Sequence, residues 1–273
     1  MDYKLVVCDM DGTLLNSEGK VSDENKETLE ALQEKGVHVA VATGRIFTSA
    51  KVYAKYLRIV TPIIACNGAL VKDLKNNENV YESPLSKEDC LKIVDICRKK
   101  NLYFHFYSED TFYTEKLENK SLKYSEWNKT QKEEDRIKIE TIKDAKELLV
   151  NSEEKIYKFL VIDENTDLLE EVREELVKAG NIECSKSWYN NMEVMNRGVK
   201  KGTAVKNLAE SLGIKPEEIV CIGDNENDIS MLEYAGMGIA MGNAEDKVKQ
   251  KANYVTDTND ESGVAKALKK FFF

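Results

Sequence analysis

The chain has 273 residues, of which 42% are hydrophobic and 33% charged, and it contains only three prolines. This composition excludes a disordered or fibrous protein and leaves room for a core domain that carries a smaller one. The net charge of −9 argues against nucleic acid as a partner, because nucleic-acid binders carry a basic surplus or stripe.

No apolar stretch approaches the about 20 residues that a membrane helix needs, and the six cysteines form no CxxC pair. We therefore expect a cytoplasmic protein with reduced thiols and no membrane partner, either a monomer or a small homo-oligomer.

The first third of the chain alternates strand patterns with helical patterns. Ser22 is a suitable N-cap for the first helix, and Gly36 marks its end. The predicted elements in chain order are a strand at Leu5–Cys8, that helix, a strand at Val37–Ala42, a helix at Thr48–Leu57 and a strand at Ile63–Cys66. This alternation is typical of a parallel sheet covered by helices.

The middle of the chain has a different pattern. An amphipathic helix at Lys87–Lys100 is followed by aromatic segments, LYFHFYS and FYT, that suit antiparallel strands. IYKFLVID predicts a further strand and NTDLLEEVREELVKAG a further helix. For His105, within the first aromatic segment, packing is favoured over catalysis, although the same segment could line a substrate pocket. We interpret residues 84–190 as an inserted α+β domain.

The last third returns to the first pattern. Its predicted elements are a helix at Thr203–Leu212, a strand at Ile219–Ile222, a helix at Asp228–Tyr234, a strand at Gly238–Met241, a helix near Lys247, a strand at Tyr254–Val255 and a terminal helix. The whole chain therefore predicts an α/β protein: a Rossmann-like parallel sheet core with helices on both faces, formed by residues 1–83 and 191–273, plus the inserted domain.

Polar residues follow the predicted parallel strands, where a sheet of this kind binds its ligands. The residues at these strand ends are Asp9 and Asp11; Thr43, Gly44 and Arg45; Asn67 and Gly68; and the acidic run from Asp224 to Asp228. Two carboxylates as close as Asp9 and Asp11 repel each other unless a cation lies between them, and oxygen ligands suit Mg²⁺. A hydroxyl, a glycine backbone and a guanidinium suit phosphate oxygens.

The segments DMDGT, ATGR, GVKKG and GDNENDISML together resemble the four motifs of the haloacid dehalogenase superfamily, specifically its Cof-type sugar-phosphatase-like branch. The resemblance covers the whole chain. It implies a Mg²⁺-dependent phosphatase that hydrolyses small phosphorylated metabolites, most simply sugar phosphates, through an aspartyl-phosphate intermediate. It also implies that residues 84–190 form a cap that sets substrate specificity, while Trp188, Asn190, Asn191 and Glu193 are either cap-side contacts or strand-packing residues.

The resemblance also implies a role for each motif residue. Asp9 is expected to be the nucleophile and Asp11 the general acid and base, with a raised pKa. Asp9, the backbone carbonyl of Asp11, and Asp224 are expected to hold Mg²⁺. Thr43 and Lys201 are expected to bind the phosphoryl oxygens.

The remaining motif residues have supporting roles in this family. Asn227 and Asp228 are expected to order the metal site and Lys201, and Asn227 also to contact the substrate phosphate. The further candidates for substrate contacts are Gly44, Arg45 and Asn67. Lys200 stands where the family usually has a small polar residue, and we choose Lys201 as the catalytic lysine because it precedes Gly202.

Two alternatives stay open. An aspartate at position 11 suits phosphoryl transfer of the phosphomannomutase kind as well as hydrolysis, and a protein that binds phosphometabolites for regulation could keep the same pocket. Three other kinds of site are excluded. A calcium-binding loop would need glycine where Ile229 stands. A serine hydrolase would need the GxSxG motif and a P-loop kinase the GxxxxGK[ST] motif, and both are absent.

Overall fold

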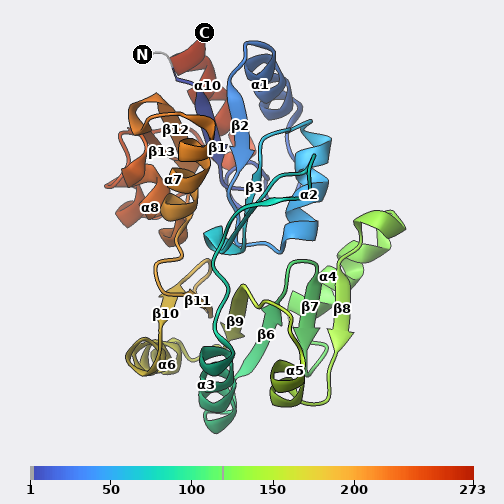
Figure 1. The fold of residues 1–273 in the computed structure, drawn as a ribbon. Coiled ribbons are helices and arrows are strands. Elements are labelled where there is room, and N and C mark those ends of the chain that lie inside the picture. The colour runs from blue at the N-terminus through green and yellow to red at the C-terminus, as the bar shows by residue number, and fades with distance from the viewer. Residues whose placement is uncertain (1–2, 119) are drawn as a thin grey trace. The chain divides into compact units, whose positions relative to one another are not determined.

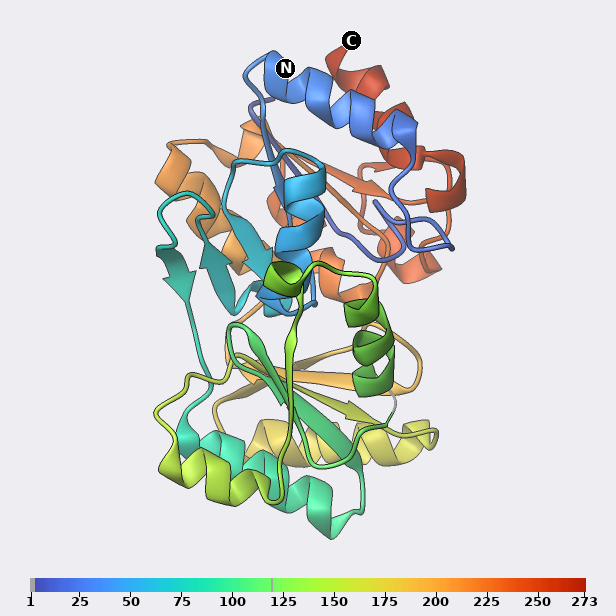
Figure 2. The ribbon, with the colours of Figure 1, turned by 90° about the vertical axis from the view of Figure 1, so that its right-hand side faces the viewer.

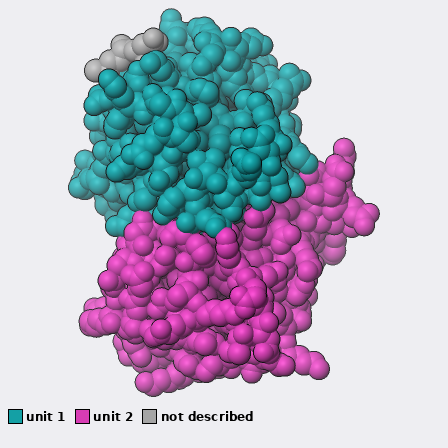
Figure 3. All heavy atoms as spheres, viewed as in Figure 1, with its two compact units in different colours: residues 1–44, 50–82, 200–273 teal, residues 45–49, 83–199 magenta. Residues whose placement is uncertain are grey.

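The computed structural model describes residues 3–118 and 120–273, and it divides into two compact units. Unit 1 consists of residues 1–44, 50–82 and 200–273, and unit 2 of residues 45–49 and 83–199 (Figure 3). Within the described residues, no helix is both long and apolar enough to cross a membrane. All six cysteines are buried thiols.

Unit 1 is built on a parallel sheet with the strand order β14-β13-β12-β1-β2 (Figure 1). The strands are β1 (Leu5–Cys8), β2 (His38–Val41), β12 (Ile219–Gly223), β13 (Met237–Ala240) and β14 (Tyr254–Val255). The α-helices that accompany them are α1 (Asp23–Glu34), α2 (Phe47–Tyr56), α7 (Lys201–Leu212), α8 (Ile229–Tyr234), α9 (Asp246–Lys249) and α10 (Gly263–Phe272). The predicted α/β fold with a parallel sheet is confirmed.

Helices cover both faces of this sheet. The central strands are apolar on both sides, as expected for a parallel sheet that is buried on both faces. Residues of α7 and α8 pack with Leu5 and Val7 on one face, while α1 and α10 lie together on the other (Figures 1 and 2). The Ser22 side chain caps α1 by accepting a hydrogen bond from the Asn25 backbone N–H, as predicted.

The third predicted strand is shorter than expected and belongs to a different sheet. β3 (Ile63–Ala65) meets β2 through one parallel bridge between Ala42 and Ile64. The chain then turns through the short 3-10 helix η1 (Cys66–Gly68), where Cys66 and Asn67 have positive φ angles of 50° and 58°. An antiparallel hairpin of β4 (Leu70–Lys72) and β5 (Asn79–Glu82) follows. The sequence analysis did not predict this hairpin.

Unit 2 is built on a sheet with the strand order β10-β11-β9-β6-β7-β8, antiparallel except for the β7–β8 pair. The strands are β6 (Tyr103–Tyr107), β7 (Thr111–Thr114), β8 (Lys138–Thr141), β9 (Lys158–Ile162), β10 (Ile182–Ser185) and β11 (Asn191–Asn196). Its helices are α3 (Lys87–Lys99), α4 (Lys120–Lys129), α5 (Ala145–Asn151) and α6 (Thr166–Ala179). Figures 1 and 2 show α3, α5 and α6 on the same side of this sheet.

The end of the insertion lies later in the chain than residue 190. β11 pairs with β9 and β10, and therefore belongs to the sheet of unit 2. Unit 2 extends to Val199. The predicted boundary at residue 190 falls directly before β11, which the sequence analysis did not predict as a strand; at the other end, unit 2 resumes at Ser83.

Candidate active site

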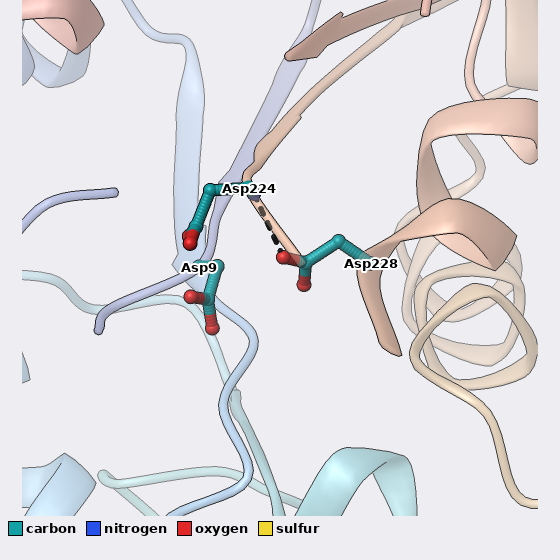
Figure 4. A group of neighbouring side chains, drawn as sticks. All are labelled: Asp9, Asp224 and Asp228. Carbon is teal, nitrogen blue, oxygen red and sulfur yellow. Dashed lines mark hydrogen bonds between the residues drawn. The ribbon is translucent and has the colours of Figure 1, made fainter. Parts of the chain in front are cut away.

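Three carboxylates gather at the carboxyl ends of the parallel strands of unit 1. Asp9 directly follows β1 and Asp224 directly follows β12, while Asp228 ends the short 3-10 helix η4 (Glu226–Asp228). Each of the three side chains offers a carboxylate oxygen, and these oxygens lie within 4.8 Å of one another. Figure 4 shows the three carboxyl groups converging from two neighbouring strand ends. Asp11, by contrast, has an exposed side chain and is not part of this group.

The Lys201 ammonium bridges two of these acids. Its Nζ lies 2.5 Å from Oδ1 of Asp9 and 2.6 Å from Oδ1 of Asp228, and the lysine is 1% exposed. The adjacent Lys200 has an exposed side chain. Lys201 therefore lies buried between two of the acidic residues.

Gly202 allows this placement of Lys201. Lys201 is the first residue of α7, and a Cβ on Gly202 would lie only 2.2 Å from the backbone oxygen of Ser230. The Gly202 N–H also donates to the Ser230 hydroxyl at 3.0 Å. The start of α7 can therefore approach Ser230 closely only with glycine at this position.

Asp228 is held by the backbone as well as by Lys201. Its Oδ2 accepts a hydrogen bond from the N–H group of Asp224 at 2.9 Å (Figure 4) and another from that of Asn225 at 3.0 Å. One carboxylate thus fixes both the turn after β12 and the ammonium of Lys201.

Thr13 is not among the residues predicted from the sequence, although it lies within DMDGT. Its hydroxyl donates a hydrogen bond to Oδ1 of Asp224 at 2.7 Å. Gly12, with φ +82°, passes so close that a Cβ would lie 2.4 Å from Oδ2 of Asp224. The loop after β1 therefore positions the Asp224 carboxylate. In the sequence, the Gly-Thr pair directly after Asp11 was the feature from which a role for Thr13 could have been predicted.

Burial and the mutual effects of three carboxylates and one lysine shift the pKa values of the residues in the site. Burial raises the pKa of Asp9 well above its usual range, against the lowering effect of Lys201, and Asp228 and Asp224 raise it further. Burial, followed by repulsion from Asp228, raises the pKa of Asp224 to about 7. Burial alone would lower the pKa of Lys201, but the carboxylates of Asp228 and Asp9 outweigh it and raise that pKa.

The donor set fits a divalent cation. When all three carboxylates are ionised, the Lys201 ammonium offsets one of their charges, and among the described residues two negative charges are left. Mg²⁺ and similar cations prefer oxygen ligands such as these three carboxylates. A bound cation would in turn favour the ionised form of each acid. The arrangement can therefore hold a metal ion next to a buried carboxylate and a buried ammonium.

The remaining predicted residues of unit 1 lie at the neighbouring strand ends. The Thr43 N–H donates to the Ile64 carbonyl and the Asn67 N–H to the Thr43 carbonyl, both at 2.9 Å. The Asn227 side-chain amide donates to Oδ1 of Asn67 at 3.2 Å. Backbone and amide contacts thus join the segments that follow β2, β3 and β12. Gly44 is the next residue after Thr43 in the first of these segments.

Arg45 differs from the other predicted residues because it belongs to unit 2, with residues 46–49. Its guanidinium donates a hydrogen bond to the Ser49 hydroxyl at 3.3 Å.

Comparisons with known proteins identify the family of the chain. The haloacid dehalogenase-like hydrolase family matches residues 6–268. The 5-amino-6-(5-phospho-D-ribitylamino)uracil phosphatase YcsE of Bacillus subtilis is 36% identical over 271 residues, which cover 98% of this chain and 96% of YcsE. The structure of a haloacid dehalogenase-like hydrolase from B. subtilis is similar, with a TM-score of 0.87, 31% identity and coverage of 97% and 99% of the two chains. A sugar phosphatase of subclass IIB has a TM-score of 0.82 and 26% identity, with 98% of each chain covered.

Proposed function

The chain belongs to the haloacid dehalogenase-like hydrolases and is a phosphatase of that superfamily, and we propose that it hydrolyses sugar phosphates and similar phosphorylated metabolites with the help of Mg²⁺. The observation that carries this proposal is the buried Lys201 ammonium between Asp9 and Asp228, with Asp224 beside them. Such a group combines a nucleophile, a counter-charge for phosphate and ligands for a cation.

In the first half of the reaction, an oxygen of the Asp9 carboxylate attacks the phosphorus. The bond from Asp9 to phosphorus forms while the ester bond between phosphorus and the leaving-group oxygen breaks. The Asp11 carboxyl gives its proton to that departing oxygen, so that an alcohol leaves and Asp9 carries the phosphoryl group. The exposed side chain of Asp11 supports this role, because it can exchange protons with solvent.

In the second half, water replaces Asp9 on phosphorus. The Asp11 carboxylate now accepts a proton from the attacking water, the bond from phosphorus to Asp9 breaks, and inorganic phosphate is released. Asp9 returns as a carboxylate and Asp11 as an acid, so that both groups are ready for the next substrate.

The other residues hold charge and geometry through both steps. Lys201 stabilises the Asp9 carboxylate and the phosphoryl oxygens, and Thr43 donates its hydroxyl to the same oxygens. Asp228 keeps Lys201 in place and Thr13 keeps Asp224 in place. Asn227, Asn67, Gly44 and Arg45 contact the substrate.

Mg²⁺ is the proposed cation, held by Asp9, Asp224 and the backbone carbonyl of Asp11. When bound, it offsets negative charge on the phosphoryl oxygens and so makes attack by an anion easier. The two negative charges that Lys201 leaves without a counter-charge support a divalent rather than a monovalent ion.

The proposed substrate class rests on two similar proteins. One is named as a sugar phosphatase, and the other acts on a compound whose name gives it a phosphorylated ribitylamino group. We propose that residues 83–199 act as the cap that selects among such leaving groups. A cytoplasmic location stays a prediction.

The test is release of inorganic phosphate from sugar phosphates, nucleotides and 4-nitrophenyl phosphate, with Mg²⁺ and with chelator. The expected result is metal-dependent release that disappears in Asp9→Ala, with sugar phosphates preferred over nucleotides. Equal release with and without divalent cations would overturn the metal assignment. Full activity of Asp9→Ala would overturn the nucleophile assignment.

A further inference from the structure

The loop that carries Asp11 crosses the carboxyl edge of the sheet of unit 1. We define it as residues 10–15 and call it the acid loop. It leaves β1, and its Thr13 hydroxyl donates to Asp224 at the end of the neighbouring strand β12. Two further contacts join the acid loop to the segments that follow β13 and β14, which are the next strands in the sheet.

Asn243, which follows β13, makes the first of these contacts. Its side-chain amide donates a hydrogen bond to the Gly12 carbonyl at 2.8 Å. Its Oδ1 accepts a hydrogen bond from the Asn259 N–H at 2.9 Å. A single side chain therefore joins the acid loop, through its donor, to the segment after β14, through its acceptor.

Asn259 makes the second contact. It follows β14 as the first residue of the short 3-10 helix η5 (Asn259–Glu261), and its side-chain amide donates to the Leu15 carbonyl at 2.9 Å. Leu15 in turn forms a parallel β-bridge with Asp11. The two asparagines thus hold the acid loop at the residue after Asp11 and at the residue that is bridged to Asp11.

Gly12 explains why the acid loop needs such contacts. Glycine is permissive and does not fix its own backbone conformation, and Gly12 has φ +82° directly after Asp11. A general acid works only when its carboxyl lies within hydrogen-bond reach of the leaving-group oxygen. The hydrogen bond to the Gly12 carbonyl therefore restricts where the Asp11 carboxyl can lie.

We propose that Asn243 and Asn259 are positioning residues for proton transfer by Asp11. They hold the acid loop so that the Asp11 carboxyl reaches the leaving-group oxygen and gives it a proton as the ester bond breaks. Neutral amides suit this role, because they bind two backbone carbonyls without adding charge near the carboxylates of the site. This inference rests on the proposed phosphatase function.

The test compares two esters whose leaving groups differ in their need for a proton. A sugar phosphate on a primary alcohol, such as glucose 6-phosphate, releases a strongly basic oxygen that must be protonated, whereas 4-nitrophenyl phosphate releases a stabilised anion. The kcat/KM covers only the steps up to departure of the leaving group, and proton donation by Asp11 is among them. The readout is the kcat/KM for the sugar phosphate that is hydrolysed fastest, divided by that for 4-nitrophenyl phosphate, at saturating Mg²⁺.

Asn243→Ala is expected to lower this ratio by about 10- to 100-fold, because general acid catalysis contributes about 100- to 10,000-fold and the variant displaces the acid without removing it. Asn259→Ala should lower it by less, since Asn243 keeps its contact with Gly12. If Asn243→Ala does not fold, Asn243→Asp replaces it, because aspartate keeps the shape and the acceptor but cannot donate to the Gly12 carbonyl.

The matched control is Asn253→Ala at the opposite, amino edge of the same sheet. Asn253 is exposed like Asn243, and its Oδ1 accepts a hydrogen bond from the Gly238 N–H in β13 at 2.7 Å. The control therefore also removes a hydrogen bond between an asparagine side chain and the backbone, but away from the acid loop. It is expected to keep the ratio.

Equal losses toward both esters in the Asn243 variant, or no loss, would overturn the inference and leave the proposed function intact. Loss of folded protein lowers both kcat/KM values by the same factor, and so cannot change the ratio. A ratio that falls as far in Asn253→Ala would also overturn the inference, because the effect would not be specific to the acid loop. If the unaltered protein released no phosphate from any sugar phosphate, the proposed function itself would fail, and the inference with it.

Discussion

Replacing Lys201 with methionine tests the centre of the proposed site. Methionine keeps much of the length of the side chain but removes the ammonium that lies 2.5 Å from Asp9 and 2.6 Å from Asp228. Because breaking a buried ion pair by removing one partner costs about 3–5 kcal/mol, we expect a loss of that size in the free energy of unfolding of the metal-free protein. Loss of a donor that stabilises transition-state charge lowers kcat by about 100- to 1000-fold.

The assay is phosphate release at saturating Mg²⁺, together with urea unfolding followed by circular dichroism. The matched control is Lys206→Met on the same helix, where the ion pair with Glu210 is long, at 3.9 Å, and exposed. Such surface pairs contribute about 0–1 kcal/mol, so the control should lose little stability and no activity. A folded Lys201→Met protein with kcat close to that of the unaltered chain would refute the assignment of Lys201 to the reaction.

Three further outcomes are expected. Asp11→Asn should still bind Mg²⁺, measured by calorimetry, while its kcat falls by about 100-fold or more, because only proton transfer is removed; near-normal turnover would contradict its acid and base role. Thr13→Val should raise the Mg²⁺ concentration for half-maximal rate by about 10- to 100-fold, because Asp224 loses its orienting hydrogen bond; an unchanged metal dependence would contradict this. Gly12→Ala should lower both stability and metal affinity, since φ is +82° and the new Cβ would lie 2.4 Å from the Asp224 carboxylate; a variant with unchanged unfolding and metal dependence would show that the loop can move at no cost.

The core of the site could be predicted because the fold determines where strand ends lie. In a parallel sheet, residues after β1 and β12 reach the same edge whatever the rest of the chain does. Asp9 and Asp224 could therefore be placed together from the strand patterns alone. Lys201 was chosen over Lys200 because it precedes Gly202, and the structure adds a reason for that glycine, whose Cα lies close to the Ser230 backbone.

Other features depend on contacts that no local pattern reveals. The hairpin of β4 and β5 is short and its second strand is partly exposed, so its alternation is weak. β11 was missed although Asn191 and Glu193 alternate with Met192 and Val194. Both polar side chains are buried, and a sequence alone does not distinguish buried polar residues from an exposed hinge. The hydrogen bond from Thr13 to Asp224 joins residues 211 positions apart, and a sequence without coordinates gives no direct sign of it.

The charge around the buried Lys201 predicts which ligands the site in unit 1 needs. Lys201 lies among three carboxylates, so the site in unit 1 keeps an excess of negative charge and is complete only with a cation, which in turn can attract a phosphate group.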